Sequence, residues 1–301
     1  MKHFLYRIFC GIAFFILIPI VFTLLIQGNG DNYFISQESV AEIGTEESEL
    51  DEDILTGIVA NEISMDTNKE AMKAQTVIAR TNCLRAIETG ENLPEGLTKS
   101  EMLKMWGQEN FSENFSLLET CIKETRGVTM TCGGSYIQAD FHRCSAGYTR
   151  DAAALYGSEE FPYLKSADSR MDITSKEFLK VMFYTPEQFI QKGGEIFSGL
   201  SPEDVYSKIS ITGKDQAGYV TEFTIDGKPY SGEEIRLLYN WNSSAFSLKE
   251  TDGKIRVITK GMGHGLGLSL YGANQLASEG YEYKDILKYY FAGIEFVTQY
   301  D

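Results

Sequence analysis

Glu62 lies where a surface helix is not expected to carry a charge. Ile54, Leu55, Ile58 and Val59 recur at helical spacing, and on a wheel of about 100° per residue they cover an arc of about 140°. Glu62 falls near the middle of that arc, so its side chain should point towards the core or into a cleft beside it. Burial disfavours a charged carboxylate and raises its pKa. Such a glutamate can hold a proton near neutral pH and donate it to a leaving oxygen, as cleavage of a glycosidic bond requires.

The same pattern also fits a structural glutamate. Its partner would be Lys73, Arg80 or Arg85, which follow on the next predicted helix. Ion pairs inside a fold perturb pKa values as active sites do. From the pattern alone the structural interpretation is favoured, and catalysis is the alternative.

A glycine-rich segment surrounds His264. Residues 261–269 read Gly-Met-Gly-His-Gly-Leu-Gly-Leu-Ser. The segment lacks the Gly-Lys-Ser/Thr of a phosphate-binding loop, and no strand–helix–strand unit accompanies it, so neither nucleotide motif applies. Glycines leave room for a bulky ligand near His264 and Ser269, including at Gly265. A tight structural turn with a satisfied histidine remains equally open.

Cys132, His142 and Cys144 have side chains suited to zinc. Their spacing matches no standard zinc motif, and a fourth ligand or a water would be needed. A disulfide between Cys132 and Cys144 and two free thiols are the competing interpretations.

The elements that position these residues alternate irregularly, which indicates an α+β fold of helices and antiparallel strands. Thr67 and Glu70 form a capping-box pattern, and Gly90 suits the end of the same helix. Asp226-Gly227 and Asp252-Gly253 are hairpin turn signals. We predict helices over residues 53–64, 67–89, 113–125, 271–278 and 283–291, and strands over 136–142, 219–225, 246–248 and 255–259.

Composition and the N-terminal segment predict where the protein works. The net charge of −16 excludes a nucleic-acid partner, whose phosphates require a basic surface. Residues 8–26 carry no charge and, at about 1.5 Å per residue, span about 28 Å as a helix, which matches a bilayer core. The charges on either side predict a cytoplasmic N-terminus and an exported remainder. A cleaved signal peptide is the alternative. We therefore divide the chain into an anchor (1–27), an acidic linker (28–52) and one large extracytoplasmic catalytic domain (53–301).

Four ordered blocks together resemble the stage II sporulation protein D (SpoIID) family. The first comprises Asn61-Glu62-Ile63-Ser64 and Glu70–Thr81, and the second is Ala139–Thr149, which contains His142, Ser145 and Gly147. Ser231–Arg236 with Ser244-Ala-Phe246 resembles a third block, and Gly261–Ala273 resembles the fourth. Leu270 stands where the family usually has glutamine, and Ala146 stands where it often has glycine.

The resemblance implies a peptidoglycan lytic transglycosylase that acts at the sporulation septum during forespore engulfment. Its substrate would be glycan already stripped of stem peptides by a partner amidase, and membrane sporulation proteins would be further partners. The family glutamate corresponds to Glu62, and the chemistry requires no cofactor. Some members are similar in binding zinc, which keeps Zn²⁺ at Cys132, His142 and Cys144 open. We expect the cleft to be lined by Gln75, Arg80, His142, Ser145, Gly147, His264, Gly265 and Ser269.

Two further functions stay open. A zinc hydrolase of wall peptides would use His142. A scaffold without catalysis would bind glycan and enhance a separate amidase, as the amidase-enhancing relatives that share these blocks imply.

Overall fold

The computed structural model describes residues 50–298. The predicted anchor at residues 8–26, the linker up to residue 49 and residues 299–301 lie outside this range. Within residues 50–298, no helix combines the length and the apolar character that crossing a membrane requires.

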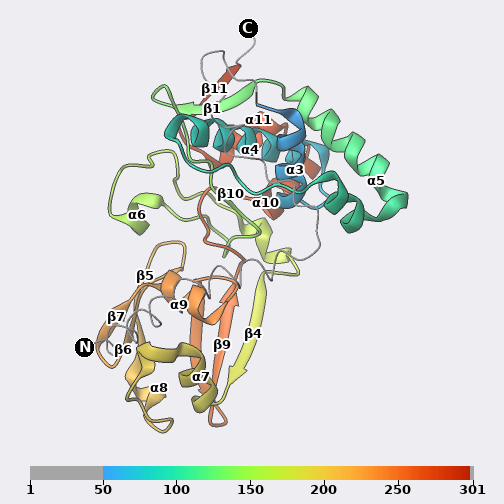
Figure 1. The fold of residues 1–301 in the computed structure, drawn as a ribbon. Coiled ribbons are helices and arrows are strands. Elements are labelled where there is room, and N and C mark those ends of the chain that lie inside the picture. Colours follow the sequence, from blue (N-terminus) through green and yellow to red (C-terminus); the bar gives the residue numbers. More distant parts are fainter. Residues whose placement is uncertain (1–49, 299–301) are drawn as a thin grey trace, which may run out of the picture. The chain divides into compact units, whose positions relative to one another are not determined.

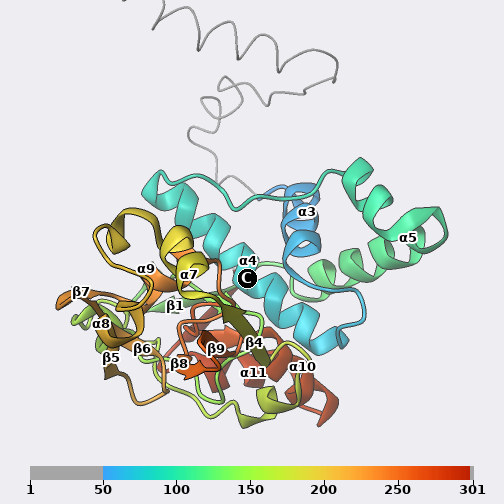
Figure 2. The same ribbon diagram turned by 90° about the horizontal axis from the view of Figure 1, so that it is seen from below.

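Three helices begin the described part (Figures 1 and 2). They are α3 (Glu52–Glu62), α4 (Lys69–Thr89) and α5 (Lys99–Glu124), and they pack against one another. Gly90 ends α4 with a left-handed φ of 73°, as predicted. The predicted capping box at Thr67 is wrong, because Asn68 caps α4 and its side chain accepts the Glu70 N–H. Helix α5 begins well before the predicted residue 113, and Gly107 interrupts it with a φ of 75°.

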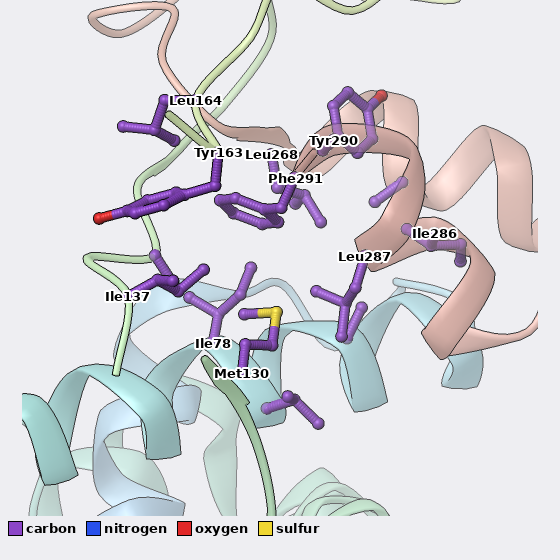
Figure 3. Packing of buried hydrophobic residues seen from close by; sticks show 14 of the residues in the cluster. Ile78, Met130, Ile137, Tyr163, Leu164, Leu268, Ile286, Leu287, Tyr290 and Phe291 are labelled. Atoms are coloured by element: carbon purple, nitrogen blue, oxygen red, sulfur yellow. The ribbon is translucent and has the colours of Figure 1, made fainter. Parts of the chain in front are cut away.

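The C-terminal end of the chain returns to this helical part. Strand β1 (Val128–Cys132) lies between β11 (Glu295–Thr298) and β2 (Ser135–Tyr136), and both pairings are antiparallel. Helices α10 (Leu270–Ser278) and α11 (Tyr283–Tyr290) pack on α4. Figure 3 shows the buried apolar side chains that these elements share, contributed among others by Ile78, Met130, Leu287 and Phe291.

The predicted strand over residues 136–142 is only partly correct. Its two ends are the strands β2 and β3 (Phe141–His142), and the residues between them are not in a strand. Strand β3 pairs in parallel with β10 (Leu268–Ser269). This pairing brings the second and the fourth sequence block side by side.

Residues 179–260 form a β-rich insertion in the helical part (Figure 1). The Gly261 N–H donates to the Phe178 carbonyl oxygen over 2.7 Å, and Leu179 pairs with Lys260, so the chain enters and leaves the insertion at one place. Its own apolar core is rich in aromatic side chains, including Phe189, Tyr239 and Trp241.

The insertion contains two antiparallel sheets. The first is ordered β4 (Leu179–Tyr184), β9 (Lys254–Lys260) and β8 (Phe246–Thr251), and the second is ordered β5 (Ile209–Lys214), β6 (Val220–Ile225) and β7 (Lys228–Tyr230). Both predicted turns are confirmed, since Asp226 and Asp252 have φ values of 48° and 51° and each precedes a glycine with positive φ. The mixed helices and antiparallel strands confirm the α+β prediction for the described residues.

The helices between residues 152 and 239 are short. They are α6 (Ala152–Tyr156), η1 (Arg170–Thr174), α7 (Pro186–Gly193), η2 (Gly194–Phe197), α8 (Val205–Lys208) and α9 (Gly232–Tyr239).

We predict that Gly267→Ala destabilises the protein by about 3 kcal/mol or more, because its φ of 67° is left-handed and a Cβ would overlap the Asp140 carbonyl oxygen. Gly90→Ala is the matched control, since Gly90 has a similar φ but open space around it. Its cost should be only about 1 kcal/mol. Urea unfolding of the two variants measures the difference, and equal losses would contradict the proposed backbone contact.

Candidate active site

Glu62 is the last residue of α3 and is half-buried. Leu55, Ile58 and Val59 on the same helix are fully buried, whereas Ile54 at the edge of the predicted arc is 37% exposed. Of the two positions that the wheel allowed for Glu62, the core or a cleft beside it, the structure has the second. The Gln75 side chain from α4 donates its Nε2–H to Glu62 Oε2 over 2.8 Å.

Burial raises the pKa of Glu62 to about 7, and the Gln75 hydrogen bond opposes this shift in part. The last turn of α3 carries no basic residue, and the C-terminal end of a helix disfavours a negative charge. The structural partners considered for Glu62 are engaged elsewhere: Lys73 pairs with Glu70 and Glu124, and Arg85 pairs with Glu91. A carboxyl that titrates near neutral pH can donate a proton and later accept one.

Glu62 opens into a cleft of about 590 Å³ between the helical part and the insertion. The helical part contributes Glu62 and His142, and the insertion contributes Lys180 and Arg236. Glu62 is the only carboxyl group among the described residues that line this cleft. The others are Asn61, Phe141, Arg143, Asn240, Trp241, Asn242, Met262, Gly263, His264 and Leu270.

Two histidines of the cleft are fixed by the backbone of a single residue, Leu266. Its carbonyl oxygen lies 3.0 Å from Nδ1 of His142, so this nitrogen carries the proton. Its N–H donates to Nδ1 of His264 over 3.1 Å, which leaves the Nε2–H of His264 as a donor. Burial, followed by the neighbouring His264, lowers the pKa of His142 to about 3, and burial also lowers the pKa of His264. Both rings are neutral at pH 7 and do not act there as acids.

The structure brings Glu62, Gln75, His142 and His264 together, but it separates other predicted site residues from them. Gln75 is fully buried behind Glu62 and acts through it. The expectation that Arg80 lines the cleft is wrong, because its guanidinium is buried and donates to the Ile122, Thr125 and Val128 carbonyl oxygens.

The predicted serines and glycines also lie behind the cleft surface. Ser145 and Ser269 are fully buried. Gly147 is buried, and its carbonyl oxygen accepts the Ser169 N–H. Gly265 packs against the Tyr219 ring. These four residues shape the backbone around the cleft and do not line it.

Sequence reasoning missed Asp172, which connects the two serines. Its carboxylate is fully buried and accepts the Ser145 N–H over 2.6 Å and the Ser269 hydroxyl over 2.9 Å. Burial raises the pKa of Asp172, while these hydrogen bonds oppose the shift. An isolated aspartate outside all four blocks gave no signal that could have identified it.

Zinc at Cys132, His142 and Cys144 stays a prediction, and no group of three or more His, Cys, Asp or Glu side chains is placed to hold a metal ion within residues 50–298. His142 donates its Nδ1–H to the Leu266 carbonyl oxygen, and its Nε2 is buried without a hydrogen-bond partner among the described residues. The backbone of Cys144 pairs with Met262. Cys132 and Cys144 are free thiols in the described part, so they do not form the disulfide considered from the sequence. Burial, together with Asp172, raises the pKa of Cys144 to about 11.

Two further cavities adjoin the cleft. One, of about 520 Å³, shares His264 with it and reaches Asp140, Tyr156 and Glu233. The other, of about 530 Å³, shares Arg143 and Leu270 with the cleft. The shared residues place these hollows in succession, with Glu62 in the middle one.

Comparison with known proteins gives consistent matches. The family model described as "Stage II sporulation protein" matches residues 44–132. The chain is similar to stage II sporulation protein D of Bacillus amyloliquefaciens, at 31% identity over 87% of this chain and 77% of the relative. Its identity to stage II sporulation protein D of Bacillus subtilis (strain 168) is 33%, over 81% of this chain and 73% of the relative. A more distant similarity, at 24% identity, covers 79% of this chain and 39% of the Bacillus subtilis (strain 168) protein named amidase enhancer.

The raised pKa of Glu62 predicts a specific dependence of stability on pH. The folded state binds this proton more tightly than the unfolded state, whose pKa is near 4.5. The Glu62 contribution to the free energy of unfolding is therefore fully present below pH 4.5 and is lost as the pH rises to about 7, by at most about 3 kcal/mol. In Glu62→Gln this loss should be absent.

Chemical denaturation of wild type, Glu62→Gln and Glu88→Gln between pH 4 and 8 tests this. Glu88 is an exposed glutamate on α4 and should leave the wild-type profile unchanged. If wild type and Glu62→Gln had parallel profiles, the pKa of Glu62 would not be raised.

Proposed function

Because the chain belongs to the stage II sporulation protein D family, we propose that it is a peptidoglycan lytic transglycosylase. Its substrate would be glycan strands without stem peptides, and its action would accompany forespore engulfment. The observation that carries the proposal is Glu62, a half-buried carboxyl with a pKa of about 7 in a cleft whose described lining offers no second carboxyl.

The proposed reaction requires only this one carboxyl. Glu62 donates its proton to the oxygen between N-acetylmuramic acid and N-acetylglucosamine as the bond from C1 to that oxygen breaks. The resulting carboxylate then takes the proton of the muramoyl C6 hydroxyl while O6 forms a bond to C1. The products are a 1,6-anhydro end and a free N-acetylglucosamine end, and Glu62 recovers its proton. Glycosidases that use water or a covalent intermediate require a pair of carboxyls instead.

Gln75 would help Glu62 through both steps. Its N–H stabilises the carboxylate that follows proton donation. Its Oε1 is buried without a partner among the described residues, and a rotated amide would offer this acceptor to the protonated acid. The neutral His264 would add an N–H donor towards the sugar.

The succession of cavities supports a polymeric substrate. The cleft around Glu62 shares His264 with one neighbouring cavity and Arg143 and Leu270 with the other. A strand lying across all three would extend on both sides of the bond that is cut.

We predict that the full-length protein converts denuded glycan strands into fragments with anhydro ends, detected by mass spectrometry. Glu62→Gln should lower the rate about 10²- to 10⁴-fold, whereas Glu88→Gln should retain it. The wild-type rate should fall as the pH rises through about 7, because the acid must be protonated. Reducing ends in place of anhydro ends would contradict the mechanism.

A scaffold that enhances a separate wall amidase is the second candidate, favoured by the similarity to the protein named amidase enhancer. Under that alternative, Glu62→Gln would support sporulation as well as wild type does. Loss of both glycan cleavage and sporulation in this variant favours the transglycosylase.

The proposed location is the outer face of the cell membrane, with residues 8–26 as a retained anchor and residues 53–301 exported. We expect protease added to intact protoplasts to degrade the catalytic domain, and the protein to become soluble when residues 1–27 are removed. A mature N-terminus beyond residue 26 would show that the segment is a cleaved signal peptide.

A further inference from the structure

Positive charge gathers around the cleft although the protein is strongly acidic. The chain carries a net charge of −16. The charged residues that line the cleft, however, are Glu62 and three cations, Arg143, Lys180 and Arg236. Since Glu62 titrates near pH 7, the local charge is positive at and below neutral pH. A cationic cleft on an acidic protein favours an anionic ligand.

Two of these cations are available to a ligand. Arg236 is neutralised by Glu233, whose Oε2 accepts from its Nε over 2.6 Å. Lys180 contacts the neutral Asn242 side chain over 3.2 Å, and no acidic partner lies within 4.0 Å among the described residues. Arg143 pairs only loosely with Glu177, at 3.6 Å and with both side chains about half exposed. Exposed pairs of this kind contribute little and exchange easily.

These charges do not serve to ionise Glu62. Its pKa is set by burial and by the Gln75 hydrogen bond and stays raised, whereas a cation in close contact would lower it. Lys180 and Arg143 therefore act on something other than the catalytic carboxyl. Lys180 comes from β4 in the insertion, and Arg143 follows β3 in the helical part, so a ligand across the cleft meets one cation from each wall.

We propose that Lys180 and Arg143 bind carboxylates on the glycan and thereby select strands whose muramic acid lactyl groups are free. This rests on the proposed function. When a stem peptide is attached, the lactyl carbonyl is a neutral amide, and when an amidase has removed the peptide it is a carboxylate. Each disaccharide then carries one negative charge. Lys and Arg recognise such carboxylates by charge-assisted hydrogen bonds, so the enzyme takes the product of an amide-hydrolysing reaction.

The test measures binding without cleavage, using full-length Glu62→Gln protein in detergent. The ligands are denuded strands, the same strands after their carboxylates are converted to methylamides, and peptide-bearing strands. Denuded strands should bind at least about 10-fold more tightly than the methylamide form. Adding Lys180→Gln or Arg143→Gln should weaken binding of denuded strands by about 3- to 10-fold each and leave the methylamide form unchanged.

Lys254→Gln is the matched control. Lys254 lies at the opposite end of β9 from the cleft, on the same sheet as Lys180. Lys254→Gln should alter neither the affinity for denuded strands nor the preference for them over the methylamide form. Circular dichroism of each variant separates loss of binding from loss of fold.

The outcomes separate this proposal from the proposed function. Equal binding of denuded and methylamide strands, or tight Lys180-dependent binding of peptide-bearing strands, would overturn the selection of free lactyl groups. If the preference and its dependence on Lys180 and Arg143 are observed while wild type produces no anhydro ends, the carboxylate site stands and the transglycosylase proposal fails.

Discussion

The buried carboxylate of Asp172 is the contact on which the cleft depends. It accepts hydrogen bonds from Ser145, just after β3, and from Ser269, which also caps α10 by accepting the Gly272 N–H. A carboxylate removed from water is costly unless its oxygens are bonded, so the two segments must meet at this point. Between them the parallel pair β3–β10 is formed. The glycine-rich loop is then held with Leu266 next to both histidines, which sets their opposite tautomers.

In the cleft, the groups that set the pKa of Glu62 are different from the groups that carry positive charge. Desolvation, opposed in part by the Gln75 amide, places the pKa of Glu62 near neutrality. The cations of the cleft do not contribute to that shift, and two of them, Lys180 and Arg143, are available to a ligand. The histidines stay neutral because they are buried. Burial thus moves the pKa values of the two histidines away from pH 7 and brings that of Glu62 to about 7.

Local signals in the sequence were sufficient for α3, α4, α10 and α11 and for both hairpin turns, whereas α6 to α9 were not predicted. Gly90, Asp226-Gly227 and Asp252-Gly253 require backbone angles that only a few residue types adopt easily, so their positions could be predicted. The strand over residues 136–142 could not be predicted correctly, because its pairing depends on β1 and on β10, more than 120 residues later. The periodicity of α5 failed at Gly107, where the helix kinks.

The same distinction holds for the candidate site. Glu62 was identified because its own helix carries the pattern around it. Arg80 was predicted at the cleft, but its side chain donates to main-chain carbonyl oxygens. The sequence around an arginine does not distinguish these two environments. Asp172 and Lys180 were missed because their surroundings come from segments about 80 to 100 residues away, joined only by tertiary packing.

The insertion at Phe178 and Gly261 has a consequence for how such a protein diversifies. Its entry and exit strands are adjacent, and its aromatic core is separate from the two cores of the helical part. Substitutions confined to this aromatic core therefore act on one wall of the cleft, whereas α3 and α4 pack in the two cores of the helical part. A lineage can thus change one wall of the cleft while it retains the surroundings of Glu62.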